Sequence, residues 1–296
     1  MATKKGVWNL QQVRDKQLQS LWGYASETNL WIWGRSEHGQ LGLNQAVPVS
    51  VSSPVQLPGT WGQGSGMLGS DRRLSAKNYV LNIKNDGSLW GWGQNNKGQL
   101  GIGIALSNRS SPMQIGGGFD WASIGDLHHY AVSTAIKTDG TLWVWGDGDS
   151  KQQYGKMIDR SSPVQVPGTT WTPNISTTNS NILAVKSDGT LWGWGRNWAG
   201  NIGDNTIINR SSPTQIPGST WRYVAAGNYL QSFGIKTDGT FWSWGNNRYG
   251  ALANNGSHPT STPGNDGVSS PTQIPGTWDT VIGGGGDNGA VALKSA

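Results

Sequence analysis

The residue types that most enzymes use for catalysis are few in this sequence and are not spaced for it. Asp147 and Asp149 flank a single glycine, but this short acidic turn lacks the glutamate that ends a calcium loop. There is no cysteine, no Gly-x-Ser-x-Gly elbow, no phosphate loop and no His-Glu-x-x-His helix. No pair of the four histidines has the spacing of a zinc site: His38, His128, His129 and His258. We therefore expect no catalytic residue, no metal and no cofactor, and predict that the chain is not an enzyme.

Two sets of residues have the chemistry of a binding surface. Trp198 and Tyr249 are aromatic, and their neighbours are Asn and Arg. Such a pair suits a sugar ring, because the aromatic face stacks on C–H groups while polar neighbours bind hydroxyls. Packing against an adjacent repeat is the alternative role for both side chains. The second set lies in variable segments that precede a recurrent turn, where we expect a composite site: Arg72, Arg73, His128, His129, Tyr130, Asn228 and Tyr229.

The elements that position these residues are set by an internal repeat. A Trp-x-Trp-Gly tetrad starts at five positions that are 49 to 59 residues apart: Trp31, Trp90, Trp143, Trp192 and Trp242. A Ser-Ser-Pro follows each tetrad, and one more tryptophan stands seven to nine residues after that proline: Trp61, Trp121, Trp171, Trp221 and Trp278. Fifteen of the 18 tryptophans are therefore fixed by the repeat. We interpret them as packing residues between blades, and not as the lining of a catalytic pocket.

Each repeat predicts four short strands. A Lys-x-Asp-Gly precedes four of the tetrads and predicts a hairpin turn, as at Lys186–Gly189. One unit then consists of strands at 182–186, 190–194, 213–216 and 221–225. Such strands cannot bury their apolar faces alone, so neighbouring units must pack radially. The fold class is therefore all-β: a five-bladed β-propeller of four-stranded antiparallel blades. We predict that Val291–Lys294 pairs with Leu30–Trp33 and closes the ring at the N- and C-terminal strands.

The repeats also resemble a known family. The pattern L-W-x-W-G-x-N-x-x-G-Q-L-G, clearest at Leu89–Gly101, is similar to the regulator of chromosome condensation repeat. That resemblance implies a β-propeller, and its founding members are seven-bladed guanine nucleotide exchangers on chromatin. This chain departs from them, with five tetrads and no long inserted wedge. Nucleotide exchange and other enzyme activity therefore rank below binding.

The residues before the first repeat are predicted to form a leader. Val7–Trp22 places four apolar side chains near one face of a helix: Leu10, Val13, Leu18 and Leu21. Residues 1–22 are expected to form a helical or extended leader, and 23–296 a single propeller domain. The leader either docks on a larger assembly or folds back on the propeller. Its Gly6–Leu10 stretch is similar to leaders on repeat proteins of bacteria and their tailed viruses, which implies a tail-fibre or particle-surface role.

Composition limits the remaining classes. The net charge is +5, but the basic residues are scattered, so nucleic acid is not indicated as a partner. No stretch has the length of a membrane span or the apolar region of a signal peptide. We expect a soluble protein, in a virion or else in the cytoplasm. Its expected function is a non-catalytic structural module that binds a protein in a larger assembly; the alternative is a lectin-like protein that binds a host-surface glycan.

Overall fold

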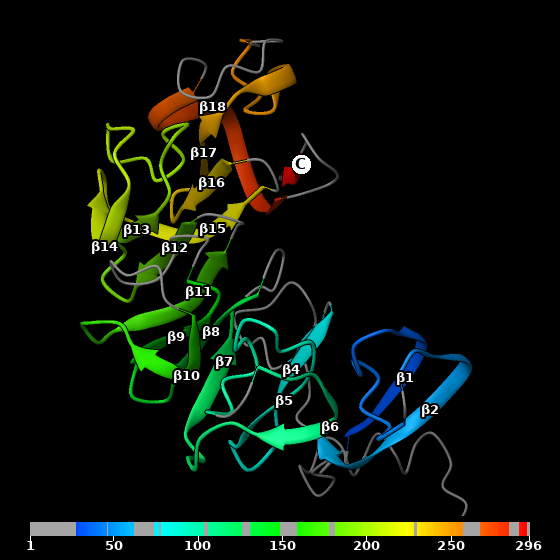
Figure 1. Cartoon of the computed structure of the whole chain (residues 1–296). Coiled ribbons are helices and arrows are strands. Elements are labelled where there is room, and N and C mark those ends of the chain that lie inside the picture. The colour runs from blue at the N-terminus through cyan, green and yellow to red at the C-terminus, as the bar shows by residue number, and fades with distance from the viewer. Residues whose placement is uncertain are drawn as a thin grey trace, which may run out of the picture.

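The regular secondary structure of the described residues is β-strand, apart from one short 3-10 turn. The computed structural model describes residues 28–45, 47–61, 74–76, 78–103, 106–125, 131–148, 159–177, 181–227, 230–256, 267–283 and 290–294. The strands of these residues form five antiparallel sheets, and Figure 1 shows the sheets one after another along an arc. One 3-10 turn, η1, spans Arg248–Gly250. This arrangement confirms the prediction of an all-β fold.

Three of the sheets are complete four-stranded blades. One contains β3 (Leu74–Ala76), β4 (Tyr79–Ile83), β5 (Leu89–Gly93) and β6 (Arg109–Gln114). The next contains β7 (Trp121–Ile124), β8 (Val132–Lys137), β9 (Leu142–Gly146) and β10 (Arg160–Gln165). The third contains β11 (Trp171–Thr177), β12 (Asn181–Lys186), β13 (Leu191–Gly195) and β14 (Arg210–Ile216). Each blade is a meander, because strands that are consecutive in sequence are neighbours in the sheet.

The sheets at the two ends of the arc differ from these blades. At one end β1 (Thr28–Ser36) pairs with β2 (Val49–Trp61) alone among the described strands. The other end has β15 (Trp221–Ala226), β16 (Gln231–Lys236), β17 (Thr240–Asn246), β18 (Gly267–Gly283) and β19 (Ala290–Lys294). The first part of β18 pairs with β17 and its last part with β19. The described strands contain no pairing of β19 with β1, so ring closure and the number of blades stay predictions.

The hairpin turns form where the Lys-x-Asp-Gly motif predicts them. In the turn between β8 and β9, the Gly140 amide donates to the Lys137 carbonyl at 3.0 Å. Gly140 has a φ of 77°, a left-handed conformation that glycine adopts without strain. The Asp139 carboxylate accepts hydrogen bonds from the Thr141 hydroxyl and amide, and these lower the pKa of Asp139. The aspartate thus fixes the turn through its hydrogen bonds, and only the glycine has a positive φ.

Three tryptophans form the centre of each complete blade. The Trp121 ring lies 6.2 and 6.3 Å from the rings of Trp143 and Trp145. The Lys137 ammonium stands 5.1 and 5.0 Å from the Trp121 and Trp143 centroids, within the range of cation–π attraction. The second tetrad tryptophans from β5 to β17 are at most 1% exposed: Trp92, Trp145, Trp194 and Trp244. The predicted packing role of these indoles is confirmed.

Adjacent blades are joined by the same indoles. The Trp145 Nε1–H donates to the carbonyl of Gln99, in a loop of the preceding blade, at 2.8 Å. Trp92 and Trp244 make the equivalent bonds to the carbonyls of Gln40 and Asn201, at 3.0 and 3.1 Å. The sequence unit and the blade differ by one strand, because the last tryptophan of a unit begins the first strand of the next sheet at Trp121, Trp171 and Trp221. This strand belongs to the following sheet because the two tetrad tryptophans that pack on its indole come after it in the sequence.

Candidate binding surfaces

Most of the residues predicted to bind a ligand lie outside the described residues. These are Arg72, Arg73, His128, His129, Tyr130, Asn228 and Tyr229, and with them the leader at 1–22. The described part of the chain contains Trp198 and Tyr249, which come from loops of neighbouring sheets. The composite site predicted for the variable segments stays a prediction.

Trp198 and Tyr249 both lie on the surface. Their exposed fractions are 43% and 57%, so about half of each side chain is open to solvent. The Arg196 guanidinium lies 4.6 Å from the Trp198 ring centroid, and that of Arg248 lies 4.7 Å from the Tyr249 centroid. Each aromatic ring is therefore held by a cation–π contact with an arginine from its own loop. Together each pair presents an accessible aromatic group beside a positive charge.

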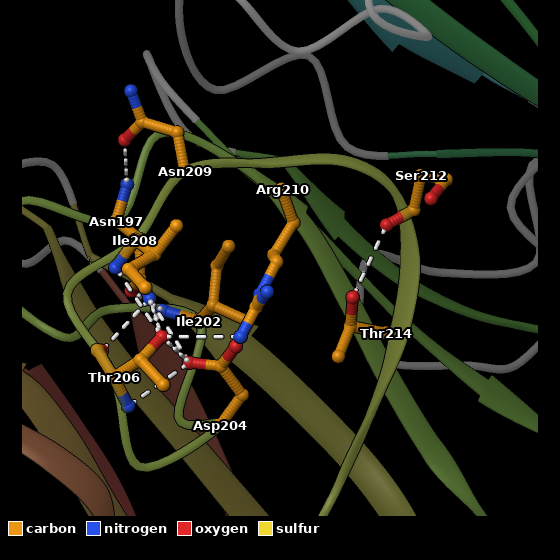
Figure 2. A network of polar contacts seen from close by, with 9 residues as sticks. All are labelled: Asn197, Ile202, Asp204, Thr206, Ile208, Asn209, Arg210, Ser212 and Thr214. Carbon is orange, nitrogen blue, oxygen red and sulfur yellow. Dashed lines mark hydrogen bonds and ion pairs between the residues drawn. The ribbon is translucent and has the colours of Figure 1, made fainter.

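A rigid polar network supports the loop that follows Trp198. The Asn197 side-chain amide donates to the Thr206 carbonyl at 2.8 Å and to the Asp204 carboxylate at 3.0 Å. Arg210 forms an ion pair with Asp204 at 2.6 Å, and the Thr206 hydroxyl donates to the same carboxylate at 2.7 Å. Figure 2 shows these side chains converging on Asp204. The network fixes residues 204–210 against the turn that contains Asn197.

The loop held by this network exposes two isoleucines that the sequence analysis did not single out. Ile207 and Ile208 are both more than half exposed, and the Ile208 amide donates to the Thr206 hydroxyl at 3.2 Å. Large apolar side chains on a fixed surface loop are typical of contact sites for another molecule. The available sequence signal is two adjacent isoleucines inside a polar loop, between Asn205 and Asn209. We name the exposed side chains of Trp198, Ile207 and Ile208 the fourth-unit surface.

Asp204 is the charged centre of the network, and its ionisation should stabilise the fold. Burial opposes that ionisation, but hydrogen bonds from Thr206 and Arg210 outweigh it and hold the pKa of Asp204 below its usual value. A carboxyl group whose pKa is lower in the folded state than in the unfolded chain stabilises the folded state. This contribution is fully present at pH values above its pKa in the unfolded chain. That contribution is lost as the pH falls through the pKa of the folded state.

We expect Asp204→Asn to lower the free energy of unfolding by roughly 1–3 kcal/mol at pH 7, since it removes a charged acceptor. The difference from the natural protein should shrink as the pH falls below about 4. Urea unfolding at a series of pH values measures both. A difference that stayed constant down to pH 2 would show that the charge of Asp204 does not contribute.

The acidic turn at Asp147 forms an ion pair with a lysine of a neighbouring blade. The Lys97 ammonium lies 3.7 Å from the Asp147 carboxylate and 3.5 Å from that of Asp159. Asp159 also accepts a hydrogen bond from the Gly148 amide at 3.0 Å. These contacts make Asp147 part of a link between blades. Within the described ranges, no group of three or more His, Asp or Glu side chains is placed to hold a metal ion.

No helix in the described ranges has both the length and the hydropathy of a membrane span.

The repeats are similar in sequence to repeats of known proteins. The regulator of chromosome condensation (RCC1) repeat model matches residues 86–132 and 188–230. The human probable E3 ubiquitin-protein ligase HERC6 is 30% identical over 151 residues, which are 47% of this chain and 13% of that protein. The ultraviolet-B receptor UVR8 of Arabidopsis thaliana is 28% identical over 144 residues, which are 45% of this chain and 29% of that protein. The chain therefore spans a small part of these relatives.

Solved structures show the same fold. Human WBSCR16 aligns with a TM-score of 0.68 and 17% identity, over 90% of this chain and 67% of that one. Prp20p of Saccharomyces cerevisiae aligns with a TM-score of 0.66 and 18% identity, over 86% of this chain and 62% of that one. Two segments of the chain thus match the RCC1 repeat, and its antiparallel sheets are blades of an RCC1-like propeller.

Proposed function

We propose that this protein is a non-catalytic protein-binding module, in which a propeller scaffold presents loops to a partner. The observation that carries the proposal is the fourth-unit surface, because its apolar side chains are exposed on a loop that hydrogen bonds hold rigid. A rigid loop loses little conformational entropy when it binds, so its apolar contacts contribute more fully to affinity. Arg196 stacks on Trp198 and places a positive charge at this surface. The partner segment that fits this surface is apolar and carries acidic residues.

Protein binding is also what is described for the fold's relatives. Yeast Prp20 is bound to Kap60 in one solved structure, and Prp20p is also described as binding Gsp1p and histones. Histones are basic, and this chain is also positively charged, with a net charge of +5. Charge repulsion therefore disfavours histones here, and favours an acidic partner.

A display screen with short random peptides tests the proposal on the full chain. We expect the selected peptides to combine apolar and acidic residues, and to bind the Trp198→Ser, Ile207→Ser, Ile208→Ser variant more than tenfold more weakly. Phe119→Ser is the matched control, because Phe119 is an exposed aromatic residue in another sheet-connecting segment. Equal binding by both variants and the natural protein would contradict the proposed surface.

Glycan binding is the second candidate, and the exposure of Trp198 and Tyr249 favours it. Each exposed ring could stack on a sugar while its arginine binds a carboxylate or sulfate on the glycan. A glycan array distinguishes the two functions. Binding that Trp198→Ala and Tyr249→Ala abolish, and that the two isoleucines do not affect, would replace the peptide proposal with a lectin-like one.

We also propose that the scaffold is a closed propeller ring. Five Trp-x-Trp-Gly tetrads support a ring of five blades, each with four strands. Attachment of this ring to a virus particle through residues 1–22 stays a prediction, since the leader lies outside the described residues. Electron microscopy of a bacteriophage or other particle that carries the protein would test it.

A further inference from the structure

Two neighbouring loops of the arc pack directly against each other: the fourth loop, between β13 and β14, and the fifth loop, between β17 and β18. A Cβ at Gly267, the first residue of β18, would lie 3.0 Å from the Ala199 Cα of the fourth loop. A Cβ at Gly245 in β17 would lie 3.3 Å from the Asn201 Cα of the same loop. The backbone of the fourth loop therefore lies against the base of the fifth loop.

This packing limits the distance between the two arginine–aromatic pairs of these loops. Trp198 is the residue before Ala199. Asn246 pairs with Gly267 and is two residues before Arg248. Standard backbone spacings along this path keep the Trp198 and Arg248 Cα atoms within about 20 Å of each other. Since about six extended residues span that distance, one peptide segment can contact both loops.

The charge of Arg248 is not balanced by a carboxylate of the described residues. In the first loop, Arg35 forms an ion pair with Glu37 at 2.7 Å. In the fourth loop, Arg210 forms one with Asp204 at 2.6 Å. Within the described ranges, no carboxylate lies at ion-pair distance from Arg248, and its Nε has no hydrogen-bond acceptor. The guanidinium therefore has a charge that an anionic group of a partner can compensate.

Tyr249 has a strained backbone although more than half of its side chain is exposed. Its φ and ψ are 59° and 26°, in the left-handed region that is unfavourable for a bulky residue. The ring stacks on Arg248 but gains little burial there. Strained residues are concentrated at ligand-contact sites, where binding gives a reason to keep them.

The repeat itself does not require this conformation. In four of the loops, the carbonyl of one glycine accepts a hydrogen bond from the amide three residues later: Gly39, Gly98, Gly200 and Gly250. The residue before that glycine is His38, Lys97 or Ala199 in the other three loops, and none of these has a positive φ. The left-handed tyrosine is therefore particular to the fifth loop.

We propose that the Arg248–Tyr249 turn and the fourth-unit surface form one site, which binds an extended peptide with acidic and aromatic residues. This inference rests on the proposed protein-binding function and names the partner class. A carboxylate fits the planar guanidinium of Arg196 or Arg248 edge-on. Aromatic side chains of the peptide pack on the exposed parts of the Trp198 and Tyr249 rings. Arginine, tryptophan and tyrosine are also the residues that most often dominate the energy of protein interfaces.

The isoleucines of the fourth-unit surface favour a peptide over other anionic molecules. Stacked aromatic rings and arginines also suit a sulfated glycan or a single-stranded nucleic acid. The aliphatic side chains of Ile207 and Ile208 have no group that hydrogen-bonds a sugar hydroxyl, and no aromatic face for a base. Apolar side chains of a peptide can cover them.

Fluorescence anisotropy with a labelled random copolymer of glutamate and tyrosine tests the site on the full chain. We expect Arg248→Gln to weaken binding more than about fivefold. Tyr249→Gly should weaken it to a similar extent, with an unchanged or higher melting temperature, because glycine adopts the left-handed conformation without strain. The matched control is Arg35→Gln, since Arg35 is an exposed loop arginine that is already paired with Glu37. This control should change binding less than about twofold.

The fourth-unit variant separates this inference from the proposed function. If Trp198→Ser, Ile207→Ser, Ile208→Ser weakens binding of the copolymer and Arg248→Gln does not, the fifth loop is not part of the site. The inference then fails, and the protein-binding surface remains. Unchanged binding by both variants would contradict the two proposals together.

Heparin and an oligothymidylate are the competing probes. Tighter binding of either one than of the copolymer, with its loss in Arg248→Gln, would replace the peptide with a glycan or a nucleic acid. No measurable binding of the copolymer to the natural protein would overturn the inference as well. A lower melting temperature in Tyr249→Gly would show that the ring supports the fold, and that its strained backbone is not kept for binding.

Discussion

Replacing Trp145 by alanine should lower the free energy of unfolding by about 3–5 kcal/mol, the range for loss of a large buried aromatic side chain. The Trp145 indole is fully buried, packs on Trp121 and donates a hydrogen bond to Gln99 of the preceding blade. The substitution leaves a cavity inside one blade and removes a bond between two blades. We expect the variant to be among the least stable single substitutions in the described blades.

Urea unfolding followed by circular dichroism measures this effect without depending on indole fluorescence. Phe119→Ala is the control, because Phe119 is exposed and its replacement should change the free energy of unfolding by no more than about 0.5 kcal/mol. A loss below about 1 kcal/mol for Trp145→Ala would mean that the blades tolerate a missing indole. The repeat tryptophans would then not be the main source of packing between blades.

The second large effect is expected at Gly101, where backbone conformation and packing both require glycine. Gly101 has a φ of 67°, and an added Cβ would lie 2.7 Å from Trp145 Nε1. The left-handed conformation costs a non-glycine residue roughly 1–2 kcal/mol. Displacing the packed indole adds about 1–3 kcal/mol. Gly101→Ala should therefore lower the free energy of unfolding by about 2–5 kcal/mol, from these two costs together.

Gly116→Ala isolates the conformational cost. Gly116 has a similar φ of 62°, and apart from its two chain neighbours no residue has an atom within 4 Å of an added Cβ. We expect this variant to lose only the roughly 1–2 kcal/mol of the backbone strain. Equal losses at the two glycines in urea unfolding would show that the indole moves aside at no cost.

The sequence predicts the hairpins well because their cause is local. Lys137, Asp139 and Gly140 form their turn with their own neighbours, so the motif and its spacing are sufficient. The tryptophan repeat likewise predicts burial, because each indole recurs at a fixed distance from a turn. The sequence did not predict which strands share a sheet, since the repeat does not show whether the strand at Trp221 pairs with the strand before it or the strand after it. In the structure it pairs forward, with Lys236.

The candidate surface depends on contacts that no local pattern shows. The sequence left open whether Trp198 and Tyr249 are exposed or packed against an adjacent repeat. Their exposure depends on the path of each loop in the folded chain. Ile207 and Ile208 were not singled out, because a pair of isoleucines in a repeat protein normally indicates a buried strand. Their exposure results from Asn197 and Asp204, whose hydrogen bonds hold the loop away from the strands. That network joins side chains from different turns, and it is a property of the folded chain.

The hairpin turns also determine how the protein should age chemically. Asp-Gly bonds commonly isomerise, because the small glycine lets its amide nitrogen attack the preceding carboxyl group. Here the Gly140 amide donates a hydrogen bond to the Lys137 carbonyl, and the Asp139 carboxylate accepts one from the Thr141 hydroxyl. Its lowered pKa also disfavours the protonated carboxyl, which is the form that cyclises. The turn is repeated at Asp86, Asp188 and Asp238, so the folded protein should resist damage at four sequences that would deteriorate quickly in an unfolded chain.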